Sequence, residues 1–353
     1  MILYVLVAFL VFGVLIFVHE LGHFLAARAS GVQVNEFALG MGPAIFQKKK
    51  GETVYSLRII PVGGFCAMEG EDEESDNPRA FARAKTWKRL VILVAGSAMN
   101  FLAGFLILLV VFSTATGFAV PVISGFFEGS KLSEETGLQV GDTLHAIDGK
   151  RVLVYSDVAM LLSRNTTGIF DLEVLRDGEK IKLEQVPMTL REFEVNGVKS
   201  LKYGMMFSSV EATFATTVKY AWYNALDFSR LVWMGLADLI SGFVSVDEMS
   251  GPVGIVSVIA ETGTSSETTA DAVLNISYLA AFLAVNLAVM NMLPIPALDG
   301  GRVFFLLVTA AIELISRKKV DPKYEGYIHA VGMVLLLGFI AFVTLKDILK
   351  LFG

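Results

Sequence analysis

Four long apolar runs constrain the fold of this 353-residue chain more than any other sequence feature. They occupy residues 1–27, 90–119, 273–293 and 327–349. Each is long enough to cross a hydrocarbon layer about 30 Å thick, because an α-helix rises about 1.5 Å per residue. Hydrophobic residues make up 54% of the chain and charged residues only 18%, which excludes an ordinary soluble domain. The sequence therefore predicts four membrane-spanning helices.

Basic residues predict how these helices are oriented. The loops after the first and third spans contain Lys48, Lys49, Lys50, Arg58, Arg79, Arg83, Lys85, Lys88, Arg89, Arg317, Lys318, Lys319 and Lys323. Because loops rich in Lys and Arg stay in the cytoplasm, both termini and the polar region between the second and third spans are expected on the opposite side. Residues 214–246 are aromatic but carry recurring charges, which favours an amphipathic interfacial helix over a fifth span.

The first apolar run contains the sequence His19-Glu20-Leu21-Gly22-His23. Ionisable side chains are costly in hydrocarbon, so a span that keeps three of them is expected to use them. Residues four apart lie on one face of a helix, so His19 and His23 can both bind one metal ion. Glu20 then lies beside a water bound to that ion, which is the HExxH arrangement of metal-dependent hydrolases.

A second group of candidate residues lies near residue 300. Pro294 and Pro296 interrupt the third span, and irregular backbone at membrane depth is tolerated only beside protein or a water-filled cavity. Asp299 follows, with Gly300 and Gly301 allowing close approach of another backbone or a ligand. Asp299 is either the third metal ligand or the N-cap of a helix over residues 303–315. The four-span topology, which places it on the same side of the membrane as the two histidines, favours the ligand.

Between the spans, two regions are expected to form β-structure. Residues 32–65 alternate apolar and polar side chains with Gly and Pro, which predicts hairpins. Residues 117–190 contain several short strands, a helix over 155–164, and an Asp177-Gly178 turn between strands 170–176 and 180–186. The net charge of -6 argues against nucleic acid as a partner, and the lone Cys66 excludes an internal disulfide.

These motifs together resemble the site-2 proteases, which are intramembrane zinc metalloproteases. The similarity is greatest to the bacterial, PDZ-containing branch that includes the regulator of sigma-E protease. Besides the two metal motifs, it covers residues 36–43, 60–65, 95–100 and 250–255, which read EFALGMGP, IPVGGF, AGSAMN and SGPVGI. The resemblance implies zinc ligands at His19, His23 and Asp299 and a catalytic acid/base at Glu20. It also implies substrate contacts at Asn291 and at Gly40 and Gly42, which match a membrane-associated hairpin that offers a strand edge.

The resemblance also implies an architecture: an α-helical polytopic membrane protein with four transmembrane helices, a membrane-associated β-hairpin region and one inserted β-rich PDZ domain. The expected parts are a first transmembrane half (1–116), the PDZ domain (117–190), a linker with interfacial helices (191–272) and a second transmembrane half (273–353). The PDZ domain is expected to act as a size filter, with peptide binding or simple structural packing as the alternatives.

The expected activity is zinc-dependent hydrolysis of peptide bonds within transmembrane segments. Expected substrates are single-pass membrane proteins such as anti-sigma factors, or remnant signal peptides, in the bacterial cytoplasmic membrane with the active site toward the cytoplasm. The ligand set also admits other first-row metals. Two alternatives are a metal transporter or sensor and a catalytically idle adaptor, and the presence of Glu20 argues against the adaptor.

Overall fold

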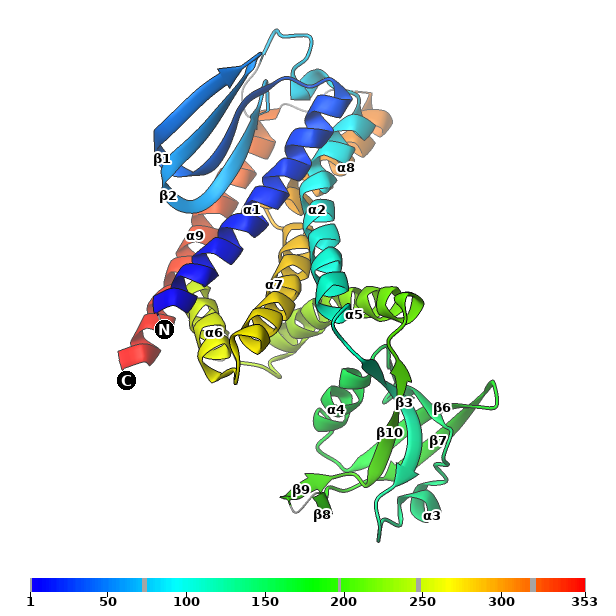
Figure 1. The fold of residues 1–353 in the computed structure, drawn as a ribbon. Helices are drawn as coiled ribbons and strands as arrows, with labels where there is room; N and C mark the ends of the chain where they lie inside the picture. The colour runs from blue at the N-terminus through cyan, green and yellow to red at the C-terminus, as the bar shows by residue number, and fades with distance from the viewer. Residues whose placement is uncertain (1, 72–74, 196–197, 246–248, 318–321, 353) are drawn as a thin grey trace. The chain divides into compact units, whose positions relative to one another are not determined.

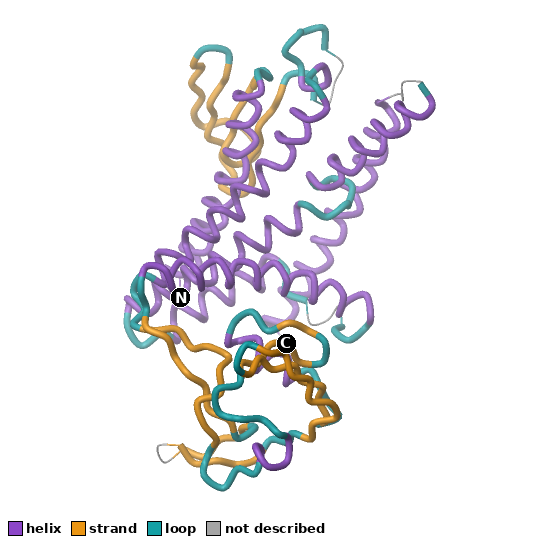
Figure 2. The backbone as a smooth tube through the Cα atoms, turned by 90° about the vertical axis from the view of Figure 1, so that its right-hand side faces the viewer, coloured by secondary structure: helices purple, strands orange, loops and turns teal. Residues whose placement is uncertain are grey.

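The computed structural model describes residues 2–71, 75–195, 198–245, 249–317 and 322–352 (Figure 1). It divides into two compact units. Unit 1 comprises Met1–Leu108 and Phe228–Gly353, and unit 2 comprises Leu109–Asp227. Helices dominate unit 1, and most of the strands lie in unit 2 (Figure 2).

Unit 1 is built around helices and one long hairpin. Its elements are α1 (Ile2–Ser30), β1 (Val34–Lys50), β2 (Thr53–Met68), the short η1 (Phe81–Arg83), α2 (Thr86–Phe112), α6 (Pro252–Ser265), α7 (Thr269–Asn291), α8 (Asp299–Ser316) and α9 (Pro322–Phe352). Helix α5 (Phe214–Ser241) joins the two units.

Four helices in the described part of the chain are long and apolar enough to cross a membrane. They are Ile2–Ser30, Thr86–Phe112, Thr269–Asn291 and Gly326–Lys350. These four candidate spans correspond to the four predicted apolar runs. The second predicted run is too long, because its helix ends at Phe112 and residues 117–119 belong to a strand. Helix α5 is not among these four, and its interfacial position stays a prediction.

Helix α1 ends at a glycine and passes directly into the hairpin. Gly31 adopts a left-handed conformation with φ of 81°. The backbone N–H groups of Gly31 and Val32 donate to the carbonyls of Arg28 and Ala27, which is the Schellman arrangement of a helix C-terminus. Strand β1 therefore starts close to the last turn of α1.

The predicted hairpin structure of residues 32–65 is confirmed, with a fold-back that the sequence did not indicate. The first half of β1 pairs on one side with residues 64–68 of β2 and on the other side with residues 54–57. Residues 44–50 of β1 pair with the other side of the 53–58 segment. The two long strands thus make a four-segment sheet, and its outer segments are residues 64–68 and 44–50.

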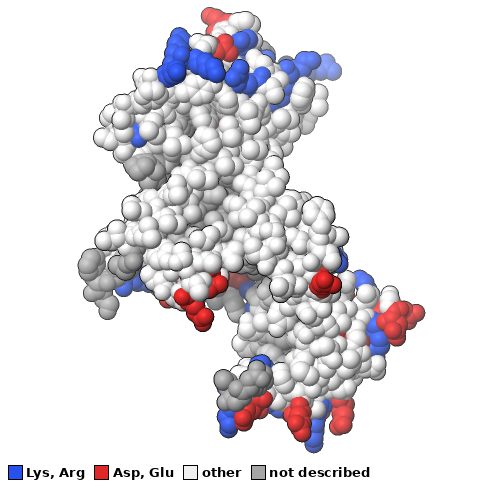
Figure 3. Space-filling model, in the orientation of Figure 1, with Lys and Arg blue, Asp and Glu red and all other residues white. Residues whose placement is uncertain are grey.

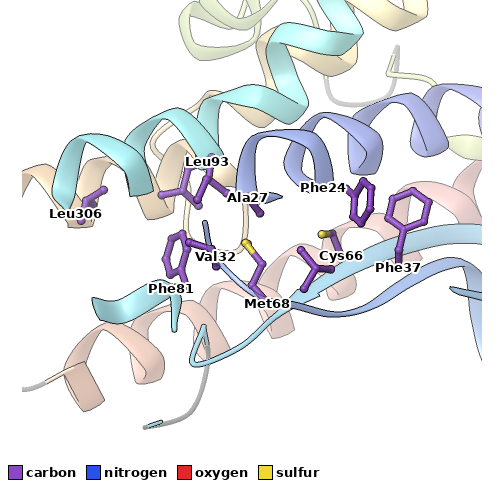
Figure 4. Close-up of a cluster of buried hydrophobic side chains, with 11 residues drawn as sticks. Phe24, Ala27, Val32, Phe37, Cys66, Met68, Phe81, Leu93 and Leu306 are labelled. Atoms are coloured by element: carbon purple, nitrogen blue, oxygen red, sulfur yellow. The ribbon is translucent and has the colours of Figure 1, made fainter. Parts of the chain in front are cut away.

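A buried apolar cluster joins the hairpin to the helices (Figure 4). It contains Phe24, Ala27, Val32, Val34, Phe37, Cys66, Met68, Phe81, Ile92, Leu93 and Leu306. The rings of Phe24 and Phe37 pack at a tilt of 51°, with ring centroids 5.1 Å apart. Because α1, α2, α8 and both strands contribute, this cluster fixes the relative positions of the elements that carry the candidate site.

Unit 2 contains a six-stranded antiparallel sheet. Its strands are β3 (Gly117–Phe126), β4 (Thr143–Ile147), β5 (Lys150–Arg151), β6 (Ile169–Arg176), β7 (Glu179–Pro187) and β10 (Met205–Glu211). They run in the order β10-β3-β4-β6-β7, and β5 pairs with β4. Helices α3 (Leu132–Thr136) and α4 (Tyr155–Ser163) and a small hairpin of β8 (Arg191–Val195) and β9 (Val198–Lys202) complete the unit.

Two local predictions for this region are confirmed. Asp177 and Gly178 both have positive φ, as a tight two-residue turn requires, and they join β6 to β7. The predicted helix is α4. The sheet itself reaches beyond the range 117–190, because β10 pairs with β3. The domain boundaries and the PDZ assignment stay predictions.

An ion pair between Asp142 and Arg176 joins the turn that precedes β4 to strand β6. The Asp142 side chain is fully buried and accepts hydrogen bonds of 2.7 and 2.8 Å from the Arg176 guanidinium. Burial alone would raise the pKa of the Asp142 carboxyl, but the bonds from Arg176 and from the Gln139 N–H outweigh it and hold that pKa below its usual range. The pair therefore stabilises unit 2 above the ordinary carboxyl pKa of about 4, and this contribution is lost as pH falls through the lowered pKa.

We expect Asp142→Asn to destabilise unit 2 at pH 7 by about 2 kcal/mol, because the guanidinium loses a charged partner. The loss should begin to shrink as pH falls below about 4, where the unfolded wild-type carboxyl binds a proton, and should vanish as pH passes through the lowered pKa of the folded carboxyl. Hydrogen exchange of β4 and β6 amides, corrected for intrinsic rates, measures both effects. Glu173→Gln, which removes the half-buried partner of the exposed Lys182, is the control and should change little. Equal effects of the two substitutions would contradict this role of the pair.

Candidate metal centre

Three potential metal ligands converge in unit 1. The Nε2 atoms of His19 and His23 lie 3.1 Å apart, and Asp299 Oδ2 lies 3.1 Å from the first and 3.2 Å from the second. Both histidines are buried, and the Asp299 side chain is 19% exposed. The structure thus brings together residues 19, 23 and 299, as the two motifs predicted. Among the described residues, these three form the only such cluster of potential ligands.

Helix α1 supplies the two imidazoles at a spacing of four residues, which places them on one face. The second ring nitrogen of His23, Nδ1, lies 2.8 Å from the carbonyl oxygen of Ile92 on α2. A carbonyl can only accept, so Nδ1 carries the hydrogen and Nε2 keeps its lone pair. The backbone of α2 thus holds His23 in the tautomer that a metal ion requires.

Two glycines permit α1 and α2 to pack closely enough for this arrangement. A Cβ atom on Gly22 would lie 2.4 Å from the carbonyl oxygen of Ala95. A Cβ atom on Gly96 would lie 2.3 Å from His23 Nε2 and 2.8 Å from His19 Cε1. Gly96 therefore leaves space beside the ligand nitrogens that any side chain would fill.

Asp299 reaches the histidines because the chain breaks between α7 and α8. Helix α7 ends at Asn291, before the two prolines, and α8 begins at Asp299. The N-cap of α8 is Leu298, which rules out the alternative that Asp299 caps the helix. Cβ atoms on Gly300 and Gly301 would lie 2.2 to 2.3 Å from backbone atoms of residues 292 and 295, so the predicted close backbone approach is confirmed.

Helix α9 holds the same loop from its other side. Ala297 adopts a left-handed conformation with φ of 78°, and its N–H donates to His329 Nδ1 at 3.1 Å. One turn along α9, a Cβ atom on Gly332 would lie 2.3 Å from Pro296 Cβ. A histidine and a glycine of α9 thus fix the strained backbone that precedes Asp299.

Glu20 lies at the junction of α1 and the hairpin. It is half-buried, and the backbone N–H of Cys66 faces its carboxylate. A Cβ atom on Gly64 would lie 3.3 Å from Glu20 Cγ. The outer strand segment of the hairpin therefore runs directly beside Glu20.

The remaining predicted site residues lie on two elements near the ligands. Asn291, at the end of α7, places its side-chain nitrogen 3.5 Å from His19 Nδ1. Gly40 and Gly42 have φ of 85° and 81° and form the bend of β1, where a Cβ atom on Gly40 would lie 2.5 Å from the Ile60 carbonyl oxygen. Gly40 directly follows Leu39, which pairs with Gly64.

Sequence reasoning gave no role to the Ile92 carbonyl, Gly96 or His329. A backbone carbonyl carries no sequence signal. Gly96 lies within the AGSAMN motif, but its role depends on the packing of α1 against α2. His329 is an ionisable residue in the last apolar run, which is itself a signal of function in a membrane span.

The residues present fit a zinc ion. Zinc takes His nitrogen and carboxylate oxygen at about 2.0 to 2.2 Å, so tetrahedral ligand atoms stand about 3.3 Å apart. The observed separations are 3.1 to 3.2 Å. Asp299 Oδ2 is buried and accepts no well-aligned hydrogen bond among the described residues, which indicates that the three atoms point toward a shared position. Three protein ligands leave the fourth position for water or substrate.

We expect Gly96→Ala to lose most of its metal, because the added methyl group would displace the ligand nitrogens. Elemental analysis of purified protein measures the zinc content. Gly13→Ala is the matched control, since it adds the same methyl group to a span with no atom within 4 Å of the new Cβ. Full zinc occupancy in Gly96→Ala would show that Gly96 does not maintain this space.

Comparison with known proteins agrees with the site. The sequence profile described as Peptidase family M50 matches residues 7–339. A Clostridium perfringens protein whose name calls it a zinc metalloprotease is 35% identical, covering 98% of this chain and 99% of its own length. A similarly named Fusobacterium nucleatum protein is 34% identical over 99% of both chains, and the regulator of sigma-W protease RasP of Bacillus subtilis is 27% identical over 97% of both. Family membership favours a hydrolase over the metal transporter and the adaptor. The chain belongs to peptidase family M50, the site-2 proteases.

Proposed function

We propose that this membrane metalloprotease hydrolyses peptide bonds within the transmembrane segments of its substrates. The observation that carries this proposal is the convergence of His19, His23 and Asp299 beside Glu20. The two histidines and Glu20 lie on α1, which is long and apolar enough to cross a membrane, and Asp299 lies at the start of α8. The names of the relatives and the fit of the ligand atoms both support zinc as the bound metal. His19, His23 and Asp299 would hold it.

Glu20 is the proposed general acid and base. Zinc, when bound, supplies Lewis-acid activation of the attacking water and of the scissile carbonyl. Glu20 takes the proton that the water gives up, and later returns it to the nitrogen of the leaving amine. The packing of residues 64–66 against Glu20 keeps the carboxylate close to the ligand cluster while it moves this proton.

The hairpin is proposed to bind the substrate as an added strand. A helical substrate hides its carbonyls in internal hydrogen bonds, so it must unwind before cleavage. Within the described part of the chain, the outer segment of residues 64–68 pairs as a strand only with β1, and it passes Glu20. An extended substrate added to this edge would bring its backbone near Glu20, with the bend at Gly40 and Gly42 setting the shape of the edge. Asn291, half-buried beside His19, is proposed to hold the substrate near the metal.

Single-pass membrane proteins and remnant signal peptides are the proposed substrates, and the bacterial cytoplasmic membrane is the proposed location. One relative is named as a regulator of sigma-W, which supports anti-sigma factors among these substrates. Lys and Arg gather at the end of unit 1 that carries the hairpin, and few charges lie along its helical middle (Figure 3). This pattern supports a cytoplasmic hairpin and an active site toward the cytoplasm. Lys318 and Lys319, also part of that argument, lie outside the described residues.

We expect Glu20→Gln to bind zinc but to cleave a transmembrane substrate at least about 100-fold more slowly, because the amide cannot accept the proton. Zinc content and the rate of product formation in detergent or liposomes measure the two effects. Glu261→Gln, on an exposed position of α6, is the control and should cleave normally. Cleavage at the wild-type rate by zinc-bound Glu20→Gln would rule out this mechanism.

Residues 117–190, which lie in unit 2, are proposed to form a PDZ domain that restricts which substrates reach the site. The antiparallel sheet of short strands and the helix α4 support the PDZ assignment. Gly117 pairs with Glu211, so the chain enters and leaves the sheet at neighbouring positions. Residues 118–210 can therefore be replaced by a short linker without stretching the chain.

We expect this deletion variant to cleave a substrate with a large folded extracytoplasmic domain as fast as a shortened form of the same substrate. The intact protein should prefer the shortened form, because a size filter excludes a substrate whose extracytoplasmic domain is large. Comparing the two rates for both proteins measures this preference. An unchanged preference in the deletion variant would contradict the filter.

A further inference from the structure

His19 has a second ring nitrogen whose hydrogen-bond partner is not fixed by the backbone. Its Nδ1 atom lies 3.3 Å from the side-chain nitrogen of Asn100 on α2 and 3.5 Å from that of Asn291. If Nε2 gives its lone pair to a metal ion, Nδ1 must carry the hydrogen of the neutral ring. That hydrogen needs an acceptor, and an amide NH₂ group offers none.

Asn100 has the acceptor that His19 lacks. It is fully buried, and its Oδ1 atom receives no hydrogen bond among the described residues. The amide oxygen and nitrogen have nearly the same size, so a half-turn of the amide exchanges them without moving a neighbour. After the exchange, Oδ1 accepts from His19 Nδ1–H, so that each of these two atoms has a partner.

The same face of α2 serves both histidines. Ile92, Gly96 and Asn100 follow one another at intervals of four, which aligns them along one side of the helix. The Ile92 carbonyl accepts from His23, Gly96 leaves room for the ligand nitrogens, and Asn100 lies at the Nδ1 atom of His19.

We propose that Asn100 is a positioning residue whose side-chain carbonyl accepts a hydrogen bond from His19 Nδ1 and so holds His19 in its metal-binding tautomer. Asn291, which is only half-buried, is thereby left to contact substrate. This inference rests on the proposed metal site.

Zinc affinity of the full chain, measured by competition with a chromogenic chelator, tests the proposal. Asn100→Leu should bind zinc about 10- to 100-fold more weakly, which is the usual effect of losing a partner of a metal-bound histidine. Asn100→Asp should bind at least as tightly as wild type, because a carboxylate can only accept from Nδ1. Ser97→Ala, a buried polar residue on the same helix, is the control and should bind like wild type.

Three outcomes separate this proposal from the metal site itself. Equal zinc affinity in Asn100→Leu and wild type would overturn the role of Asn100 alone, as would equal weakening in Asn100→Asp and Asn100→Leu. Wild-type protein that binds no zinc would overturn both. If a variant fails to fold, nitrogen-15 NMR of histidine-labelled, zinc-loaded wild type still decides, because a His19 Nδ1 atom without hydrogen would overturn the proposal.

Discussion

The convergence of three ligand atoms from opposite ends of the chain is the constraint on which the rest of unit 1 depends. His19 and Asp299 are separated by 280 positions in sequence, yet their ligand atoms lie 3.1 Å apart. Ligand atoms this close together require α1, α2 and the start of α8 to pack against one another within narrow limits of distance. Gly22, Gly96 and the pair at 300 and 301 satisfy this requirement, because each removes a side chain at a point of backbone contact.

Polar groups around the site are arranged so that donors meet acceptors away from water. The Ile92 carbonyl accepts from His23, and the Ala297 N–H donates to His329 on α9. Within a membrane, an unpaired polar group is costly, so each of these bonds also holds an element in position. The proposed acceptor role of Asn100 extends the same pattern to His19, and would give both imidazoles a fixed orientation before metal binds.

Much of the architecture could be predicted from the sequence, because local patterns encode it. The four spans follow from the length of the apolar runs, and the hairpin from alternation and glycine. The turn at Asp177 and Gly178 follows from the Asp-Gly pair, because these residue types tolerate the positive φ that both positions adopt. The fold-back of β1 and β2 and the pairing of β10 with β3 could not be predicted in this way, because each joins segments through register and not through composition.

The sequence by itself determined which residues are candidates for metal binding, since His19, Glu20 and His23 lie at helical spacing and Asp299 follows a proline break. Only the tertiary structure decided what surrounds them. The space at Gly96, the Ile92 carbonyl, the place of Asn100 and the bond from Ala297 to His329 all depend on distances between separate helices. Helix packing sets those distances through the summed shape of many side chains, which no local pattern records.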